Sequence, residues 1–544
     1  MSCACGQGLA EQGEQLQGLN AQLTERVSEL EARLERAERE RDEYRKLHML
    51  AREENERLKR GLIGQKAQRP PADDRQLTLD IMGLLLGDQE KEASREEKHA
   101  VVPQHTRRKA VRKPLPEHLE RVSFELVPEE VERDGRDAFE VIGVDRREVL
   151  ERRPASLVVV ETIRPKFVRK ADKAALSTAV LVAEPAELPI EKGMAGPGLL
   201  ADTVVKRWQD HLPLNRQEAI YARDGIELNR STICTWHGEL SRLVDPLVEA
   251  MRIDALLQPY LCVDATGVLV QHPERCKRGH FWVMVAPRRH VLYEFSLHHD
   301  SKAVDDLLGN FKGYLVADAH VVYDHIFGDG RAIEVGCWCH LRKYVLEAYS
   351  VDPDVVRAGL ACIQALFEIE RDIKHAPASL RSSERDRRSR PLVAKFFKWC
   401  EDQTETALDG SPLRAATRYA TNQRAALERF LEDQRLPLHN NISELNLRRQ
   451  AVGRKAWLFV GSEDGGHVNT RFVSLLASCA MHKIEPWAYL RDLFCLLPNW
   501  PINRVLELAP VNWRETLAQS EVQQKLDANL YRRVTLMQPL RAVA

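Results

Sequence analysis

The sequence lacks the features that mark a membrane protein, a secreted protein or a disulfide scaffold. No apolar run reaches the roughly 18 residues that a membrane-spanning helix needs. The first residues, MSCACGQG, do not have the basic-then-apolar order of a signal peptide. The 11 cysteines are odd in number and scattered along the chain, which favours reduced thiols over a disulfide framework. We therefore expect a cytoplasmic protein without a membrane segment.

A net charge of either sign is also missing. The 80 Lys and Arg residues nearly balance 81 Asp and Glu residues, although charged residues make up 30% of the chain. Net charge therefore predicts no partner, and any nucleic-acid surface must come from local clusters. A chain of 544 residues is too long for one hydrophobic core, so we expect about three or four structural units.

The first predicted unit is a long helix over residues 14–62. Leu23 and Leu30 lie seven residues apart, and Val27 and Leu34 fill the intermediate positions, as in the seam of a left-handed coiled coil. Polar residues dilute the seam further along. The pattern favours a homodimer or a higher oligomer, and a single amphipathic helix packed on its own chain is the alternative.

A basic linker is predicted over residues 63–118, because the proline pair in GQKAQRPPADD cannot continue the helix. Its run QHTRRKAVRK can contact DNA phosphates or act only as a solvated tether. Residues 119–172 contain strand-like pieces such as SLVVVETI, which predict a small β unit. Its core is expected from the apolar residues Phe139, Val141, Ile142, Val144, Leu157, Val158, Val159 and Val160.

Residues 185–255 are predicted to be helical. Gly225 interrupts the pattern, and Asn229 through Ser231 offer a cap for the next helix. Helix, short turn and helix are compatible with a DNA-binding helix-turn-helix. The same pattern is typical of any helical hairpin, so it identifies no function alone.

The remainder predicts an α/β core over residues 256–480, followed by a helical tail over residues 481–544. PYLCVDATGVLVQ, GHFWVMVAP and HVLYEFSLH are strand-like and separated by polar or glycine-containing turns. A helix at 301–310 and a strand ending at Asp318 follow. A charged helical insertion is expected at about 341–435. In a mixed sheet of this order, the first and fourth strands can lie side by side.

Three carboxylates stand out in this core: Asp264 in the first strand, Asp318 at the end of the fourth, and Glu444 in NNISELNLRR. A single aspartate at a strand end is often only a cap. Asn441 or Ser443 can cap the helix that carries Glu444. Carboxylates that converge from two strands and a helix suit a pair of Mg²⁺ ions, and three unrelated caps are the alternative.

Two other groups of residues are candidates for metal or nucleic-acid binding. Cys337, Cys339 and His340 are poorly spaced for tetrahedral metal, which favours structural thiols and a buried or DNA-facing histidine. The basic cluster after Glu444 is a stronger nucleic-acid signal, because Trp457 and Phe459 follow it and an aromatic ring can stack on a base. A charged helix face in front of an ordinary core strand is the alternative. GSEDGGH lacks the Lys-Ser/Thr of a nucleotide-binding loop.

These segments resemble the insertion-sequence-66 family of bacterial transposases. REENERLKRGLIGQKAQR is similar to the N-terminal coiled-coil segment of that family, and DHLPLNRQEAIYARDGIELNRSTICTWH is similar to its helical DNA-binding segment. VDATGVLV and FKGYLVADAHVVYD resemble its two aspartate strands. GCWCHLRKYVLEA resembles a Cys-Trp-Ala-His-x-Arg-Arg signature, and NNISELNLRRQAVGRKAWLFVGSEDGG resembles the block that supplies the glutamate.

The resemblance implies a ribonuclease-H-like mixed sheet with a helical insertion and an Asp-Asp-Glu triad, here Asp264, Asp318 and Glu444. It implies cleavage at transposon ends with two Mg²⁺ or Mn²⁺ ions, followed by attack of the freed 3′-hydroxyl on target DNA. The partners implied are DNA and small accessory transposition proteins, and the protein is expected at the bacterial nucleoid when bound. Residues expected to contact DNA are Arg230, His340, Arg342, Lys343, Arg448, Arg449, Arg454 and Lys455.

The sequence departs from the family at a few points. Ala265 stands where a glutamate is usual, Cys339 and Lys343 vary the signature, and Leu445 replaces an arginine. Residues 119–172 contain no cysteine where relatives carry a zinc-binding unit, so no zinc is expected. The leading interpretation is an active transposase, and the alternative is a catalytically inactive, dimeric DNA-binding protein derived from one.

Overall fold

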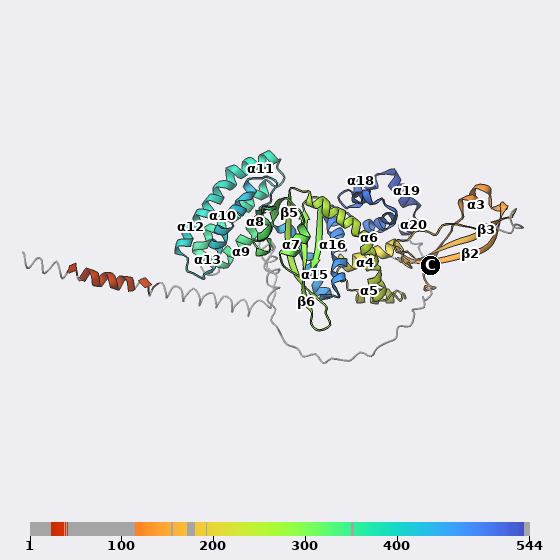
Figure 1. Ribbon diagram of the computed structural model, residues 1–544, viewed down its shortest axis with the longest axis horizontal. Helices are drawn as coiled ribbons and strands as arrows, with labels where there is room; N and C mark the ends of the chain where they lie inside the picture. Colours follow the sequence, from red (N-terminus) through yellow and green to blue (C-terminus); the bar gives the residue numbers. More distant parts are fainter. Residues whose placement is uncertain are drawn as a thin grey trace, which may run out of the picture. The chain divides into compact units, whose positions relative to one another are not determined.

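The computed structural model describes residues 23–24, 26–36, 38–39, 41, 115–153, 156–170, 180–191, 193–349 and 353–537 (Figure 1). Contact clustering divides the chain into two compact units. Unit 1 comprises Met1–Arg75 and Gly336–Leu438, and unit 2 comprises Gln76–Val335 and His439–Ala544. A search of the described helices finds none that combines the length and apolarity needed to cross a bilayer.

The predicted N-terminal coiled coil is described only in part. Residues 23–24, 26–36, 38–39 and 41 are helical. The four seam positions Leu23, Val27, Leu30 and Leu34 are between 51% and 60% exposed. Self-association through this seam stays a prediction. The basic run expected to contact DNA, from Arg107 to Lys113, lies outside the described residues.

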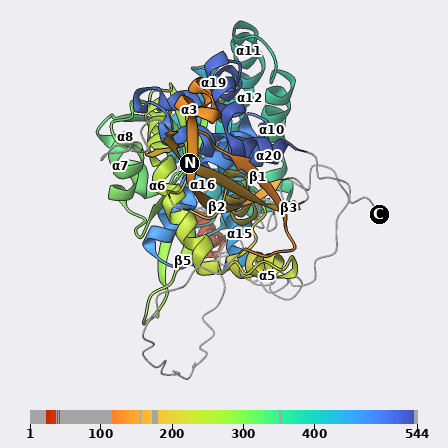
Figure 2. The same ribbon diagram turned by 90° about the vertical axis from the view of Figure 1, so that its right-hand side faces the viewer.

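A small four-stranded sheet forms where the β unit was expected, and Figure 2 shows three of its strands together in the turned view. Its elements are β1 (Glu120–Glu125), α3 (Glu129–Asp134), β2 (Phe139–Arg153), β3 (Ser156–Arg169) and β4 (Val180–Val182). The central strand is β3, which pairs with β1 in parallel and with β2 and β4 antiparallel.

Two hydrophobic clusters hold this sheet. One contains Val131, Phe139 and Phe167, and the other joins β2 and β3 to Tyr531 and Val534 of the C-terminal helix α20 (Leu530–Leu536). The core predicted from the sequence is wrong for three residues, because Val141, Ile142 and Val144 are 45% to 52% exposed. They lie on the distal part of β2, beyond the reach of α20, and a bulge between Val141 and Gly143 disturbs the alternation there.

Three helices then lead to the central sheet: α4 (Pro197–Trp208), α5 (Leu214–Arg223) and α6 (Arg230–Leu256). Pro197 occupies the first turn of α4, where its missing N–H is not needed. Gly225 follows α5 with a φ of 75°, in the left-handed region. A residue with a side chain would be strained there, so glycine suits the turn after the helix. Asn229 precedes α6, but its side chain makes no capping hydrogen bond.

The central sheet of unit 2 has the order β7-β6-β5-β8-β9, with β10 paired to the far end of β5. Its strands are β5 (Tyr260–Val270), β6 (Lys277–Ala286), β7 (His290–Ser296), β8 (Gly313–Val316), β9 (Ala332–Val335) and β10 (Phe459–Val460). The pairings of β6 are antiparallel, and β5, β8 and β9 are parallel. The expected adjacency of the first and fourth strands is confirmed.

Helices cover this sheet and extend to the C-terminal part. They are α7 (Ser301–Leu308), α8 (Asp324–Gly328), α15 (Asn441–Trp457), α16 (Glu463–Met481), α17 (Pro486–Leu496), α18 (Trp513–Leu517) and α19 (Ser520–Ala528). The edge strand β7 is closed by α16, because the hydroxyls of Ser474 and Ser478 accept hydrogen bonds from the backbone N–H groups of Tyr293 and Val291 at 2.8 and 3.0 Å. This pairing satisfies donors that an open edge would expose.

The described residues of unit 1 that follow Gly336 are mainly helical, as expected for an insertion. Its helices are α9 (Trp338–Tyr349), α10 (Pro353–Asp372), α11 (Ala378–Glu384), α12 (Arg390–Thr406), α13 (Pro412–Asn422) and α14 (Arg424–Glu428). Short 3₁₀ or π segments in the two units are η2 (Arg136–Ala138), η4 (Val321–Tyr323), η5 (Arg385–Ser389), η6 (Arg429–Leu431), η7 (Leu497–Asn499) and η8 (Ile502–Leu508). Trp338 is fully buried against Phe396 at a ring-centroid distance of 5.4 Å and anchors the insertion's core.

Candidate active site

The two aspartates predicted from the sequence occupy equivalent positions on neighbouring strands. Cys262 of β5 pairs with Val316, the last residue of β8. Asp264 lies two residues after Cys262, and Asp318 lies two residues after Val316. Both aspartates are half-buried. Parallel neighbours lie roughly 4.8 Å apart, so equal offsets from one register pair bring the two carboxylates to the same level of the sheet. The strand β8 ends before Asp318 rather than at it.

A buried phenol responds to both aspartates. Tyr323 is 1% exposed and follows β8 in the short segment η4. Burial raises its pKa well above the usual 10, and the negative charges of Asp318 and Asp264 raise it further. Both aspartates therefore lie within electrostatic range of the same phenol.

The helix α15 is attached to the part of β5 that carries Asp264. On one side of β5, β8 pairs with residues 260–262 and β10 pairs with residues 269–270. Between these two paired segments, no described strand pairs with that side of β5, and α15 contacts it instead. The side-chain amide of Asn440 donates to the carbonyl of Val263 at 2.8 Å, and the guanidinium of Arg454 donates to the carbonyl of Gly267 at 2.5 Å.

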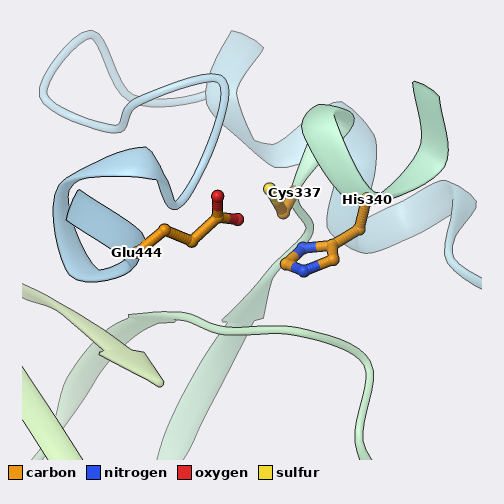
Figure 3. A group of neighbouring side chains, drawn as sticks. All are labelled: Cys337, His340 and Glu444. Atoms are coloured by element: carbon orange, nitrogen blue, oxygen red, sulfur yellow. The ribbon is translucent and has the colours of Figure 1, made fainter. Parts of the chain in front are cut away.

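This attachment positions Glu444. Glu444 lies in the first turn of α15, and its side chain is half-buried (Figure 3). It follows Asn440 by four residues and therefore lies one helical turn from the contact with Val263. A third tie fixes the same turn, because the hydroxyl of Tyr293 in β7 donates to the carbonyl of Asn446 at 2.7 Å. Asp264 therefore directly follows the residue of β5 that accepts the hydrogen bond from Asn440, and Glu444 lies one helical turn after Asn440.

The cap expected for this helix is wrong. Asn440, not Asn441 or Ser443, is the capping residue, and its side chain makes no cap bond to the helix. Its Nδ2 donates to Val263 of β5, so the orientation of the amide is set by the sheet and not by the helix. Ser443 is buried and donates its hydroxyl proton to the carbonyl of Asn440 at 2.8 Å.

A group of aromatic rings beside Asp318 was missed by the sequence analysis. His299 stacks on Trp282 at a centroid distance of 4.9 Å and meets His320 edge-on at 4.7 Å. Burial lowers the pKa of His299, as does the neighbouring His320, whereas the charge of Asp318 opposes that shift. The signal available in the sequence was the histidine two positions after the aspartate in VADAH.

The basic cluster of α15 is less free than the sequence suggested. The guanidinium of Arg449 donates to the side chain of Gln209 at 2.8 Å, and Arg454 is engaged with β5. Arg448 is half-buried and Lys455 is exposed. Two of the four predicted DNA contacts therefore have structural partners within unit 2.

The sequence analysis also predicted that an aromatic ring after the basic cluster can stack on a base, and the two candidate rings differ in exposure. Trp457 is only 9% exposed and packs with Val268, Val270, Phe281, Phe295 and Val460 in a hydrophobic cluster. The prediction that Trp457 can stack on a base is wrong, because a ring in this cluster is covered by its neighbours. Phe459 is 40% exposed and keeps an accessible ring.

In unit 1, the predicted residues of the cysteine-histidine signature lie at the start of α9 (Figure 3). Cys337 and Cys339 are buried, and His340, Arg342 and Lys343 are half-buried. Arg230, predicted from the helical segment of unit 2, is exposed at the first residue of α6.

The donor atoms of Asp264, Asp318 and Glu444 are carboxylate oxygens. Mg²⁺ and Mn²⁺ prefer such hard ligands, whereas Zn²⁺ prefers sulfur and nitrogen. Asp264 also accepts a hydrogen bond from the backbone N–H of Ala265 at 2.7 Å, which orients one carboxylate oxygen. Each of the three side chains therefore offers the type of ligand atom that Mg²⁺ and Mn²⁺ prefer.

Known proteins match the chain over most of its length. Residues 192–468 match the family described as "Transposase IS66 family", residues 474–511 match "IS66 C-terminal element", and residues 50–123 match "Transposase C of IS166 homeodomain". Two proteins of Sinorhizobium fredii are similar. Uncharacterized protein y4qI is 31% identical over 428 residues, which cover 74% of this chain and 77% of y4qI. Uncharacterized protein y4hP is 27% identical over 494 residues, 85% of this chain and 88% of y4hP.

Proposed function

The chain belongs to the IS66 family of transposases, and we propose that it cleaves and joins DNA strands at transposon ends through Asp264, Asp318 and Glu444. The observation that carries this proposal is the register of β5 and β8, which gives the two aspartates equal offsets from the pair Cys262–Val316. The mixed sheet, with one aspartate within β5 and one just after the adjacent parallel strand β8, supports a ribonuclease-H-like core. The helical insertion Gly336–Leu438 is compatible with the same assignment.

The three carboxylates would hold two Mg²⁺ or Mn²⁺ ions. Once bound, such a pair activates the attacking oxygen and stabilises the leaving oxygen on phosphorus. Asn440 and Tyr293 keep the first turn of α15 in place, so that Glu444 is held by the sheet rather than by a loop. Tyr323 stays protonated at working pH because its pKa is raised, and it therefore adds no negative charge to the carboxylates.

The reaction needs no energy-rich cofactor. Water attacks a phosphorus at the transposon end, and one P–O bond is replaced by another, which leaves a 3′-hydroxyl and a 5′-phosphate. That hydroxyl then attacks a phosphodiester of the target and displaces a 3′-oxygen, again with one P–O bond formed and one broken. The glycine-containing segment that begins α16 supports this account, since it is a helix start capped by Ser462 rather than a triphosphate loop.

DNA would be held by other basic residues that the sequence analysis singled out. Arg230 and Lys455 are exposed, and Arg448, Arg342, Lys343 and His340 are half-buried. Arg449 and Arg454 act as positioning residues for α15, because they contact Gln209 and Gly267. Dimerisation through residues 14–62 and cooperation with small accessory proteins belong to the same proposal.

The test is cleavage and joining of labelled transposon-end DNA by the full-length protein, with Mg²⁺ and with EDTA. We expect nicking at the end and strand transfer with Mg²⁺, and neither with EDTA. Specific end binding without cleavage in Mg²⁺ or Mn²⁺ would favour the second candidate, an inactive DNA-binding protein derived from a transposase. Light scattering of full-length protein and of a variant lacking residues 14–62 tests the oligomer.

A further inference from the structure

A large cavity in unit 2 lies apart from the carboxylates. Its volume is about 1100 Å³, and it is lined on one side by α4, α5 and α6 and on the other by the end of α15, β10 and the start of α16. Ligand pockets in proteins are usually roughly 300 to 1,000 Å³, so this one accommodates a group as large as a nucleotide. The strand-transfer chemistry proposed above uses none of its residues except Arg230.

The cavity presents donors that lack acceptors. Arg207 of α4 is half-buried, and desolvation lowers its pKa to about 10. No carboxylate forms an ion pair with it among the residues that the structure describes. Its neighbour Trp208 is 8% exposed, and the indole Nε1–H has no hydrogen-bond acceptor. The two groups stack, with the guanidinium carbon 4.9 Å from the ring centroid.

A buried donor without an acceptor destabilises a protein. Its presence beside a desolvated cation indicates a ligand that supplies acceptor oxygens or nitrogens. The rest of the lining has the same sign, since Arg216, Arg230 and Arg242 also face the cavity while Asp464 is its one carboxylate. An anion with a flat, acceptor-bearing ring matches this combination of guanidinium groups and an aromatic wall.

The rim carries two exposed apolar side chains. Leu458 is 65% exposed and Phe459 is 40% exposed, and both line the cavity. Leu458 also has φ 65° and ψ −49°, a strained conformation for a residue with a side chain. A strained backbone that holds an apolar side chain in solvent indicates a functional contact, and apolar wedges of this kind separate stacked bases in DNA complexes.

We propose that this cavity receives an unpaired nucleotide of the bound DNA, with Leu458 as the wedge that fills the gap in the duplex. The proposal rests on the proposed function, since it requires DNA as the partner. Arg207 and the Trp208 indole N–H supply donors to the phosphate or to the acceptors of the base. The outer arginines bind the flanking phosphates.

The experiment compares two short DNA duplexes of the same sequence, one fully paired and one with a single unpaired thymidine. Fluorescence anisotropy with the full-length protein in EDTA gives the ratio of their dissociation constants. We expect the wild type to prefer the duplex with the unpaired base by about tenfold, as one stacked base contributes. A duplex with an abasic residue at the same place should lose this preference, because the base itself occupies the cavity.

Three variants locate the effect. Arg207→Leu and Leu458→Gly should reduce the ratio to about one, and Trp208→Phe, which keeps a ring but removes the N–H, should reduce it in part. Affinity for the paired duplex should stay within about twofold, since Arg207 and Trp208 do not contact it. Arg223→Leu, an exposed arginine on α5 outside the cavity, should behave as the wild type.

Several outcomes would overturn the inference. They are an equal affinity of the wild type for both duplexes, a preference that survives in Arg207→Leu and Leu458→Gly, and an abasic duplex bound as tightly as the one with thymidine. Competition by free thymidine monophosphate at equal concentration would assign the cavity to mononucleotides instead. Metal-dependent cleavage by the wild type in any of these cases would leave the proposed function standing. Failure to bind either duplex would remove both.

Discussion

Two helices of unit 2, α4 and α15, begin against the sheets that they cover, and a buried polar side chain anchors the start of each. For α15 the side chain is the neutral amide of Asn440, which donates to Val263. For α4 it is the carboxyl of Glu151 in β2, fully buried, which accepts from the backbone N–H of Leu199 at 2.7 Å. A neutral anchor keeps its hydrogen bond at every pH, whereas a buried carboxyl makes its helix sensitive to protonation.

The two anchors differ in the groups that surround them. In α15 the anchor lies one turn from Glu444, and a neutral amide holds that turn without a titration of its own. In α4 the anchor joins the small sheet to the helical segment. Burial raises the pKa of Glu151 to about 8, against the lowering effect of the backbone N–H groups.

The largest expected effect concerns the carboxylate that α15 carries. Glu444→Gln removes a charged ligand and should abolish Mg²⁺-dependent cleavage of end DNA while leaving binding of that DNA nearly unchanged. Asp318→Asn should behave in the same way. The control is Glu515→Gln, an exposed residue of α18. Cleavage by Glu444→Gln at the wild-type rate would exclude this glutamate from the triad.

The second effect breaks the anchor of α15. Asn440→Ala leaves the carbonyl of Val263 without its donor and should lower the free energy of unfolding by about 1 to 3 kcal/mol. Cleavage should fall as well, because the first turn that holds Glu444 loses a tie to β5. Urea unfolding and the cleavage assay measure the two quantities. Asn503→Ala, an exposed asparagine, is the matched control, and equal stability of both variants would contradict the role given to Asn440.

The third effect is the pH dependence of the anchor of α4. A carboxyl whose pKa rises from 4.5 in the unfolded chain to about 8 in the fold binds more protons when folded. Stability is therefore highest below the unfolded value and falls as pH rises toward 8, by up to about 1.4 kcal/mol per pH unit. Calorimetry between these limits should show this decline in the wild type. In Glu151→Gln, which is neutral throughout, this contribution should vanish, and an unchanged slope would refute it.

Much of the central sheet follows from local sequence patterns. The apolar runs that contain Asp264 and precede Asp318 predict strands, and their adjacency follows from the order of a mixed sheet. The contact between Asn440 and Val263 joins residues 177 positions apart, and no local pattern contains it. The sequence could therefore suggest candidate carboxylates, but not the hydrogen bond that attaches the start of α15 to β5.

Side-chain exposure was harder to predict than strands. Val141, Ile142 and Val144 are typical of a core strand, yet they are 45% to 52% exposed and belong to neither cluster of the small sheet. Trp457, next to a basic helix, suggested a surface ring, yet it closes a cluster with Phe281 and Phe295. In both cases burial is decided by a distant element, α20 for β2 and the sheet for Trp457, and composition does not identify that element.

The smallest expected effect lies at the other end of α15, where strain replaces anchoring. Leu458 ends the helix with φ 65°, a conformation that glycine adopts without steric cost. Leu458→Gly should therefore raise the free energy of unfolding by about 0.5 to 1 kcal/mol. The matched control is Leu445→Gly, also exposed, at 62%, but within the same helix, where glycine should lower stability by about 1 kcal/mol. Opposite signs for the two substitutions in urea unfolding would separate stored strain at the helix end from ordinary helix propensity. A loss of stability in both would mean that Leu458 is held by packing, and its exposed position at the rim of the cavity would then need no functional explanation.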